Sequence, residues 1–297
     1  MTPILRGTLA ALAFISTVWS AATPAAADDF ETCARASGEQ AIAACTRAIN
    51  SGRYSGRQLA ALFASRCAEL SDKQESDKAI EDCSQAIRLN PNGTDAFSNR
   101  GGAYRAKGQY DRAIEDLSQA IRLNPNDADS FNNRGLAYNE KGQYDRAIED
   151  LNQAIRLNPD LVDAFYNRGI AYRRKGQYDR AIEDYNQAIR LNPNYAAAFN
   201  NRGLAYNNKG QYDRAIEDLN QTIRLNPNFA DAFYNRGVSW ERKNDLQRAL
   251  ADFKKFSELA PSDPDGPKAV HKGVERSVIA VFSMRHRPID SLRHRTT

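Results

Sequence analysis

The chain has 297 residues, of which 26% are charged and 41% are hydrophobic, and its formal net charge is +4. This composition fits a folded globular or repeat protein and excludes a chain that is disordered over most of its length. Tyr and Phe occur 13 and 12 times, whereas Trp occurs twice. This bias indicates that a few aromatic positions are reused along the chain, so internal repeats are expected.

Residues 1–27 have the pattern of a secretory signal peptide. Arg6 supplies the positive start, residues 9–19 are largely apolar, and three alanines at 25–27 precede Asp28 as a cleavage site. The apolar stretch is shorter than the ~20 residues that a membrane span needs. An uncleaved N-terminal anchor is the alternative. We therefore expect a periplasmic or secreted protein without a membrane span after signal cleavage.

Four cysteines lie in the N-terminal part of the chain, and four cysteines allow three disulfide pairings. The midpoint between Cys33 and Cys45, and that between Cys67 and Cys83, each falls in a turn-like stretch. Each pair therefore straddles a hairpin turn symmetrically, and we predict one disulfide inside each of two helical hairpins. Free buried cysteines are the alternative. A zinc site is not expected, because no C-x-x-C spacing occurs.

From residue 94 the sequence restarts every 34 residues. Phe97, Asn99, Arg100 and Gly101 recur in each restart, and a Gly-Gln-Tyr-Asp-Arg-Ala-Ile-Glu-Asp segment follows in the first four. The five windows are 94–127, 128–161, 162–195, 196–229 and 230–263. The window 60–93 is a degenerate copy that has lost its turn glycine, and 28–59 is a shortened hairpin.

Each window predicts two helices joined by a tight turn. In 162–195, Phe165, Gly169 and Tyr172 recur at helical spacing on one face. Gly176 supplies the residue able to take a positive φ at the helix end, and Pro193 ends the second helix. Asn244 replaces this turn glycine in the last window.

A second glycine lies in the middle of each predicted first helix, where it costs ~0.5–1 kcal/mol relative to alanine. We expect close approach of the paired helix to compensate for this cost. The glycines are Gly101, Gly135, Gly169, Gly203 and Gly237, and the alanines expected opposite them are Ala113, Ala147, Ala181, Ala215 and Ala249.

This order of residues resembles the tetratricopeptide repeat: an aromatic residue, glycine four positions on, tyrosine three further, then alanine, aromatic or leucine, alanine and proline. The resemblance covers 94–263 strongly and 60–93 weakly. The chain is also similar to exported bacterial proteins that contain this repeat. It implies an all-α fold, a right-handed superhelical solenoid of antiparallel helix pairs whose first helices line a concave face.

The chain departs from that family at one repeated position, where arginine replaces the usual leucine. We predict that these arginines pack their stems along the helix and reach acids such as Asp116 or Asp150. They are Arg100, Arg134, Arg168, Arg202 and Arg236.

One asparagine of each first helix is expected on the face opposite the core. Its amide offers one acceptor and two donors, so it can pair with a peptide backbone of any sequence. Such a ladder resembles the one in the repeat domain of O-linked N-acetylglucosamine transferases. The alternatives are that duplication alone reproduces the ladder and that the aliphatic residues beside it are buried between first helices. The candidate peptide-binding residues are Asn99, Asn133, Asn167, Asn201, Asn235, Leu136, Ile170, Leu204, Tyr166 and Tyr234.

A basic carboxylate clamp, the ligand mode of the chaperone-adaptor repeats, is not expected. The matching position holds an acid in four of the five windows, and this acidity disfavours an acidic C-terminal peptide. The residues at this position are Asp95, Asp129, Asp163, Ala197 and Asp231.

Nothing in the sequence indicates an enzyme or a cofactor, since all three histidines lie beyond residue 263 and no nucleotide, metal or hydrolase motif occurs. Residues 264–297 form a basic tail with seven Lys and Arg and three acids, which accounts for the whole net charge of +4. We expect part of this tail to form a capping helix over the last repeat.

We therefore predict a non-catalytic scaffold that binds a protein or an extended peptide, with no nucleic acid partner. One alternative is a structural docking subunit of an envelope enzyme or export complex. The other is a polyanion binder that uses the basic tail.

Overall fold

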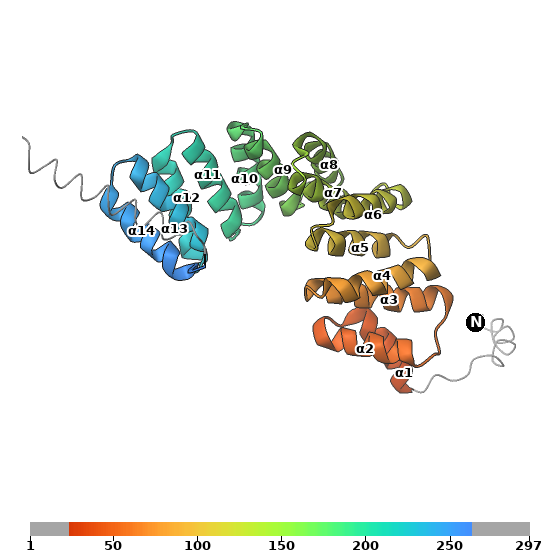
Figure 1. Ribbon diagram of the computed structural model, residues 1–297. Coiled ribbons are helices and arrows are strands. Elements are labelled where there is room, and N and C mark those ends of the chain that lie inside the picture. The colour runs from red at the N-terminus through yellow and green to blue at the C-terminus, as the bar shows by residue number, and fades with distance from the viewer. Residues whose placement is uncertain (1–23, 263–297) are drawn as a thin grey trace, which may run out of the picture. The chain divides into compact units, whose positions relative to one another are not determined.

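The computed structural model describes residues 24–262, and its side chains from residue 29 onward. The predicted capping helix and most of the predicted signal peptide lie outside these residues. All secondary structure within the described range is α-helical (Figure 1), as the repeat pattern predicts. The fourteen helices of this range are α1 (Pro24–Arg35), α2 (Gly38–Asn50), α3 (Gly56–Asp72), α4 (Ser76–Leu89), α5 (Thr94–Ala106), α6 (Tyr110–Leu123), α7 (Ala128–Glu140), α8 (Tyr144–Leu157), α9 (Val162–Arg174), α10 (Tyr178–Leu191), α11 (Ala196–Asn208), α12 (Tyr212–Leu225), α13 (Ala230–Arg242) and α14 (Leu246–Leu259).

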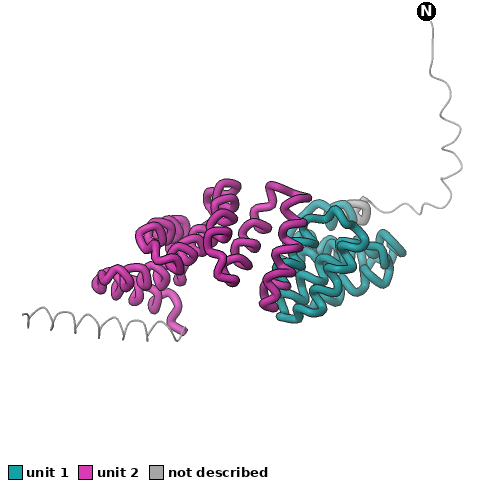
Figure 2. The backbone as a smooth tube through the Cα atoms, turned by 90° about the horizontal axis from the view of Figure 1, so that it is seen from above, with its two compact units in different colours: residues 1–137 teal, residues 138–297 magenta. Residues whose placement is uncertain are grey.

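The chain divides into two compact units, residues 1–137 and 138–297, so that the boundary falls inside α7 (Figure 2). Unit 1 contains α1 to α6, and unit 2 contains α8 to α14. Inside each unit, consecutive helices pack as antiparallel hairpins, and each hairpin packs on the next. The odd-numbered helices are the first helices of these hairpins, and the even-numbered ones are the second helices.

The hairpin turns depend on one residue with a positive φ. Gly176 takes a φ of +74° between α9 and α10, and Asn244 takes 62° between α13 and α14. Both were predicted for this role. In the degenerate window that lacks the glycine, Gln74 adopts a φ of 62° between α3 and α4. The turn conformation therefore persists there although its residue has changed.

The glycines in the middle of four first helices, Gly101, Gly169, Gly203 and Gly237, are sites of close packing. A Cβ on Gly169 would lie 2.6 Å from Cε1 of Tyr185, and a Cβ on Gly101 would lie 2.7 Å from Cγ of Leu117. The paired helix does come close, as predicted. The nearest atoms, however, belong to the large residue one turn beyond the predicted alanine, because the side chain of that residue lies directly over the glycine. The carbonyl oxygen of Ala113 would lie 3.2 Å from the same Cβ on Gly101.

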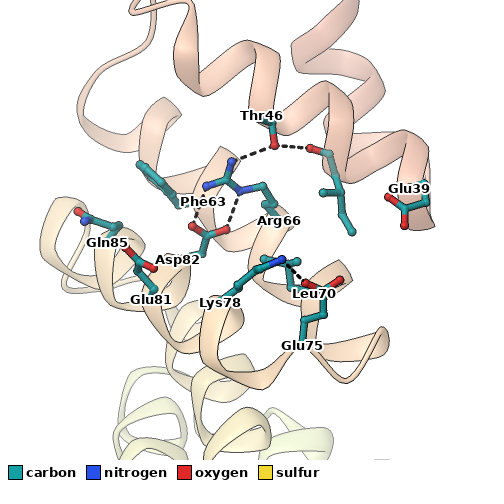
Figure 3. Close-up of a pocket in the computed structure, with 11 residues that line it drawn as sticks. Glu39, Thr46, Phe63, Arg66, Leu70, Glu75, Lys78, Glu81, Asp82 and Gln85 are labelled. Atoms are coloured by element: carbon teal, nitrogen blue, oxygen red, sulfur yellow. Dashed lines mark hydrogen bonds and ion pairs between the residues drawn. The ribbon is translucent and has the colours of Figure 1, made fainter.

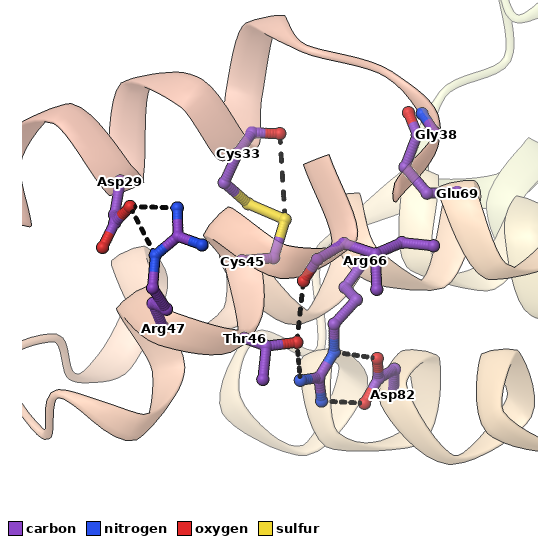
Figure 4. Close-up of a disulfide and its surroundings, with 10 residues drawn as sticks. Asp29, Cys33, Gly38, Cys45, Thr46, Arg47, Arg66, Glu69 and Asp82 are labelled. Atoms are coloured by element: carbon purple, nitrogen blue, oxygen red, sulfur yellow. Dashed lines mark hydrogen bonds and ion pairs between the residues drawn. A yellow bond between two sulfur atoms is a disulfide. The ribbon is translucent and has the colours of Figure 1, made fainter. Parts of the chain in front are cut away.

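Two disulfides staple the first two hairpins. Cys33–Cys45 joins α1 to α2, and Cys67–Cys83 joins α3 to α4; Figure 4 shows the first of these. This is the pairing predicted from the positions of the hairpin turns, and it leaves none of the four cysteines free. All four side chains are buried among small residues such as Ala44 and Ala79.

The arginines that replace the leucine of the repeat connect neighbouring hairpins. Arg66 donates two hydrogen bonds to Asp82 on its own second helix and one to Thr46 on the preceding second helix (Figure 4). Arg100 does the same with Asp116 and Ser84, so the predicted contact to Asp116 is present. The pattern continues in unit 2 with Arg168, Asp184 and Asn152, with Arg202, Asp218 and Asn186, and with Arg236, Asp252 and Asn220.

Candidate peptide-binding pocket

The five asparagines of the predicted ladder lie in different environments. Asn99, Asn133 and Asn201 are half-buried, whereas Asn167 and Asn235 are buried, with exposed fractions of 5% and 9%. The repeated sequence therefore does not place five equivalent amides on one surface.

In unit 2, several amides connect first helices to each other. Asn235 donates to Oδ1 of Asn200 at 3.0 Å, and Asn207 donates to the backbone carbonyl of Asn235 at 3.2 Å. Ser239 donates to Oδ1 of Asn207 at 2.8 Å. These bonds hold α11 against α13 and use the Nδ2 of Asn235, which a peptide would otherwise contact. Asn139 makes the matching bond to the backbone carbonyl of Asn167, at 2.8 Å.

A pocket of about 410 Å³ opens where α9, α11 and α13 come together in unit 2. Five of the ten predicted peptide-binding residues line it: Tyr166, Asn201, Leu204, Tyr234 and Asn235. The other lining residues are Arg173, Asn200, Phe229, Asp231 and Phe256. Residues from three successive first helices, with Phe256 from α14, thus contribute to one site.

The remaining predicted residues lie elsewhere. Asn99, Asn133 and Leu136 belong to unit 1, where each is half-buried. Ile170 packs against the cluster of Ala181, Tyr185 and Ala205 in unit 2. This location of Ile170 agrees with the alternative that the aliphatic stripe is partly buried between helices.

The walls of the pocket are aromatic. The ring of Tyr166 packs against Tyr195 with centroids 4.9 Å apart, and the ring of Tyr234 packs against Phe256 with centroids 5.1 Å apart. Asn201 donates to the hydroxyl of Tyr166 at 2.9 Å. Burial raises the pKa of Tyr166 above its ordinary value, so the pocket presents a neutral phenol there.

Half of the residues that line the pocket were not predicted from the sequence. Asn200 and Arg173 lie at positions that change from one window to the next, and Phe229 and Phe256 belong to a loop and a second helix. A pattern that repeats every two windows could have indicated that successive windows are not equivalent. Position five of the window alternates between Asn and Tyr in Asn132, Tyr166, Asn200 and Tyr234.

A larger concavity of about 530 Å³ lies in unit 1, between α2, α3 and α4 (Figure 3). Four of its charged side chains form two pairs: Arg66 with Asp82, and Lys78 with Glu75. Glu39 at its edge pairs with Lys73. Most of the charged groups of this hollow are thus paired within the protein.

Family models match the repeat windows. A model described as TPR repeat matches residues 101–142, 135–176 and 169–210, and models described as tetratricopeptide repeat match 196–229 and 231–263. Together these matches cover more than half of the chain. The chain belongs to the tetratricopeptide repeat family. Scaffolds of this family are typical of protein–protein interaction and are usually non-catalytic.

Solved structures resemble this tetratricopeptide repeat protein. MamA is 31% identical, with a TM-score of 0.50 over 55% of this chain and 95% of that one. YrrB, described as a TPR protein with an unusual peptide-binding site, is 26% identical, with a TM-score of 0.51 over 64% of this chain and 96% of that one. A sequence comparison with curated proteins gives no match.

A third structure, the APC/C hetero-tetramer Cut9–Hcn1, gives a TM-score of 0.67 at 17% identity over 84% of this chain. The alignment covers 54% of that chain, so the repeat protein spans about half of its length. At this identity the likeness shows the fold alone.

No helix in residues 24–262 is long and apolar enough to cross a bilayer. No group of three or more His, Cys, Asp or Glu side chains in the same range is placed to hold a metal ion.

Proposed function

We propose that this protein is an exported, non-catalytic scaffold that holds an extended segment of another protein against its first helices, in the pocket of unit 2. The observation that carries the proposal is the convergence of Tyr166, Asn201, Leu204 and Tyr234 from three first helices on one pocket. Pockets that bind small ligands or peptide side chains combine apolar walls with a few polar groups that fix orientation.

The chemistry of the pocket suits a polypeptide. Tyr166, Tyr234 and Phe256 supply flat apolar area at low conformational cost. The amide of Asn201 keeps its Oδ1 for a peptide N–H, because its two hydrogen bonds, to Tyr166 and to the carbonyl of Ala197, both use Nδ2. The volume of about 410 Å³ accommodates side chains of a short segment. The description of YrrB as a peptide-binding relative supports the same class of ligand.

Export rests on the cysteines and on the predicted signal. Disulfides persist in oxidising compartments and are rare in the cytosol, and all four cysteines of this chain are paired. Periplasmic or secreted localisation predicts a mature protein that begins at Asp28, which intact-mass measurement of the natively expressed protein tests. A mature chain that retains residues 1–27 would contradict export by cleavage.

Binding in the pocket is tested by site-specific photo-crosslinking in the native host. A photoreactive phenylalanine analogue replaces Leu204, which lines the pocket, or Glu183, which is exposed on the second helix α10. We expect a discrete protein adduct from the Leu204 position and none of that size from Glu183. An adduct from Glu183 alone would show that the partner binds the second helices, and would favour the structural docking subunit instead.

A further inference from the structure

Arg173 is a cation without a carboxylate partner. Its side chain lines the pocket, and its Nε is buried without a hydrogen-bond partner. Two neighbouring arginines are paired: Arg168 of the same helix with Asp184, and Arg202 of the next first helix with Asp218. Arg173 makes no ion pair within the described residues.

In the two adjacent windows, the repeat position of Arg173 carries an asparagine with a different role. One window earlier Asn139 occupies this position, and one window later Asn207 does; each donates to a backbone carbonyl of the following first helix. Arg173 makes no such bond, and the junction of α9 with α11 has the bond of Asn201 to Tyr166 instead. The pocket therefore opens where the side-chain-to-carbonyl bond made by Asn139 and Asn207 is missing.

The only acid among the residues that line the pocket is Asp231, on α13. Asp231 is exposed and forms no ion pair with Arg173. On α11, between them, Ala197 stands where four windows carry aspartate. The missing acid leaves the cationic end of the pocket without a nearby carboxylate from that helix.

The pocket thus holds two opposite charges that do not neutralise each other. A guanidinium that has lost part of its hydration gains most from a carboxylate, which it can bind through two parallel hydrogen bonds. The tyrosines beside Arg173 do not supply that anion, since burial raises the pKa of Tyr166 and Tyr185. Complementary charges in a peptide-binding site contribute mainly to selectivity.

We propose that the pocket of unit 2 selects an extended peptide that carries an acidic side chain opposite Arg173 and a basic side chain opposite Asp231. The proposal rests on the proposed function and specifies its ligand. It narrows the expectation that an acidic C-terminal peptide is disfavoured, because at the position from which that expectation was drawn α11 carries Ala197 instead of an acid.

The test is panning of a random dodecapeptide phage library against the full-length chain and against Arg173→Glu. Arg174→Glu is the matched control, because Arg174 is exposed on the same last turn of α9 and does not line the pocket. Both variants place an acid at a helix C-terminus and bear the same unfavourable dipole interaction. Circular dichroism and the urea midpoint establish that both remain folded.

We expect peptides selected on the wild type and on Arg174→Glu to share an acidic and a basic residue at a fixed spacing. Synthetic versions should bind Arg173→Glu at least about tenfold more weakly, and Asp231→Asn should relax the requirement for the basic residue. Selected peptides whose binding depends on Leu204 but not on Arg173 would overturn this proposal and leave the proposed function standing. Peptides that depend on neither residue, or no enrichment at all, would count against both.

Discussion

Arg100 and Asp116 form a bidentate ion pair between α5 and α6. The Nε of Arg100 donates to Oδ2 of Asp116 at 2.7 Å, and its Nη2 donates to Oδ1 at 2.8 Å. The third nitrogen, Nη1, donates to Ser84 on α4 at 3.0 Å. The side chains are 19% and 8% exposed, and the hydrogen bond to Asp116 raises the pKa of Arg100. One guanidinium therefore ties together three helices at a position where the family usually carries leucine.

Restoring the usual leucine of the repeat should destabilise this protein. Arg100→Leu leaves the carboxylate of Asp116 buried without its cation, which costs about 3–5 kcal/mol. Urea unfolding followed by circular dichroism measures the loss. The double variant Arg100→Leu, Asp116→Leu should recover most of it, because the uncompensated charge is gone. Equal stabilities of the single and double variants would show that the buried carboxylate is not the cause.

Two adjacent glycines of α5 should respond oppositely to alanine. A Cβ on Gly101 would lie 2.7 Å from Leu117, whereas a Cβ on Gly102 would meet nothing within 4 Å. Gly101→Ala should therefore destabilise by ~1–3 kcal/mol through overpacking. Gly102→Ala should stabilise by ~0.5–1 kcal/mol through helix propensity. The comparison uses urea midpoints, and changes of the same sign in both variants would refute the packing role of Gly101.

Tyr185 should make the protein less stable at high pH. Burial raises the pKa of its hydroxyl well above the ordinary value, with the nearby Arg173 acting in the opposite direction. Above pH ~10 the unfolded chain releases this proton and the folded chain retains it. The folded state then binds more protons, so the free energy of unfolding falls as pH rises.

The free energy of unfolding of Tyr185→Phe should thus lie within about 1 kcal/mol of the wild-type value at pH 7. Above pH 10 the variant should become more stable than the wild type by up to about 1.4 kcal/mol per pH unit. Phe253 fills the equivalent position over Gly237, which indicates that the ring alone fits. Urea unfolding at pH 7, 10 and 11 measures the gap, with Tyr178→Phe on the same helix as control. A gap for Tyr185→Phe that does not change with pH would contradict the prediction.

Removing the second disulfide should loosen the N-terminal hairpins. Replacing Cys67 and Cys83 by alanine removes a cross-link of α3 to α4, which typically costs about 2–4 kcal/mol. The measurement is the rate of proteolysis within residues 29–90, with and without reductant. The wild type should become sensitive on reduction, whereas the variant should be sensitive throughout. Maleimide labelling of the native, non-reduced wild type would show a free thiol and contradict the pairing.

Features that depend on residues close together in sequence were predictable. The repeat length, the two helices of each window and the turn residues Gly176 and Asn244 follow from local propensity. The disulfide pairs followed from the symmetry of a hairpin about its turn, and the contact of Arg100 with Asp116 joins the two helices of a single hairpin.

The binding site depends instead on contacts between successive hairpins. Asn201 and Asn235 occupy the same position of the repeat and both line the pocket, yet Asn235 is buried and bonds to Asn200, whereas Asn201 is half-buried and bonds to Tyr166. Their neighbours on adjacent first helices differ, and those neighbours decide which partner each amide bonds to and how much of it stays exposed. The same contacts leave Arg173 without a carboxylate. The sequence by itself therefore determined the helices and their pairing, whereas only the tertiary structure decided which polar groups remain open to a ligand, because that depends on packing between residues about one repeat apart.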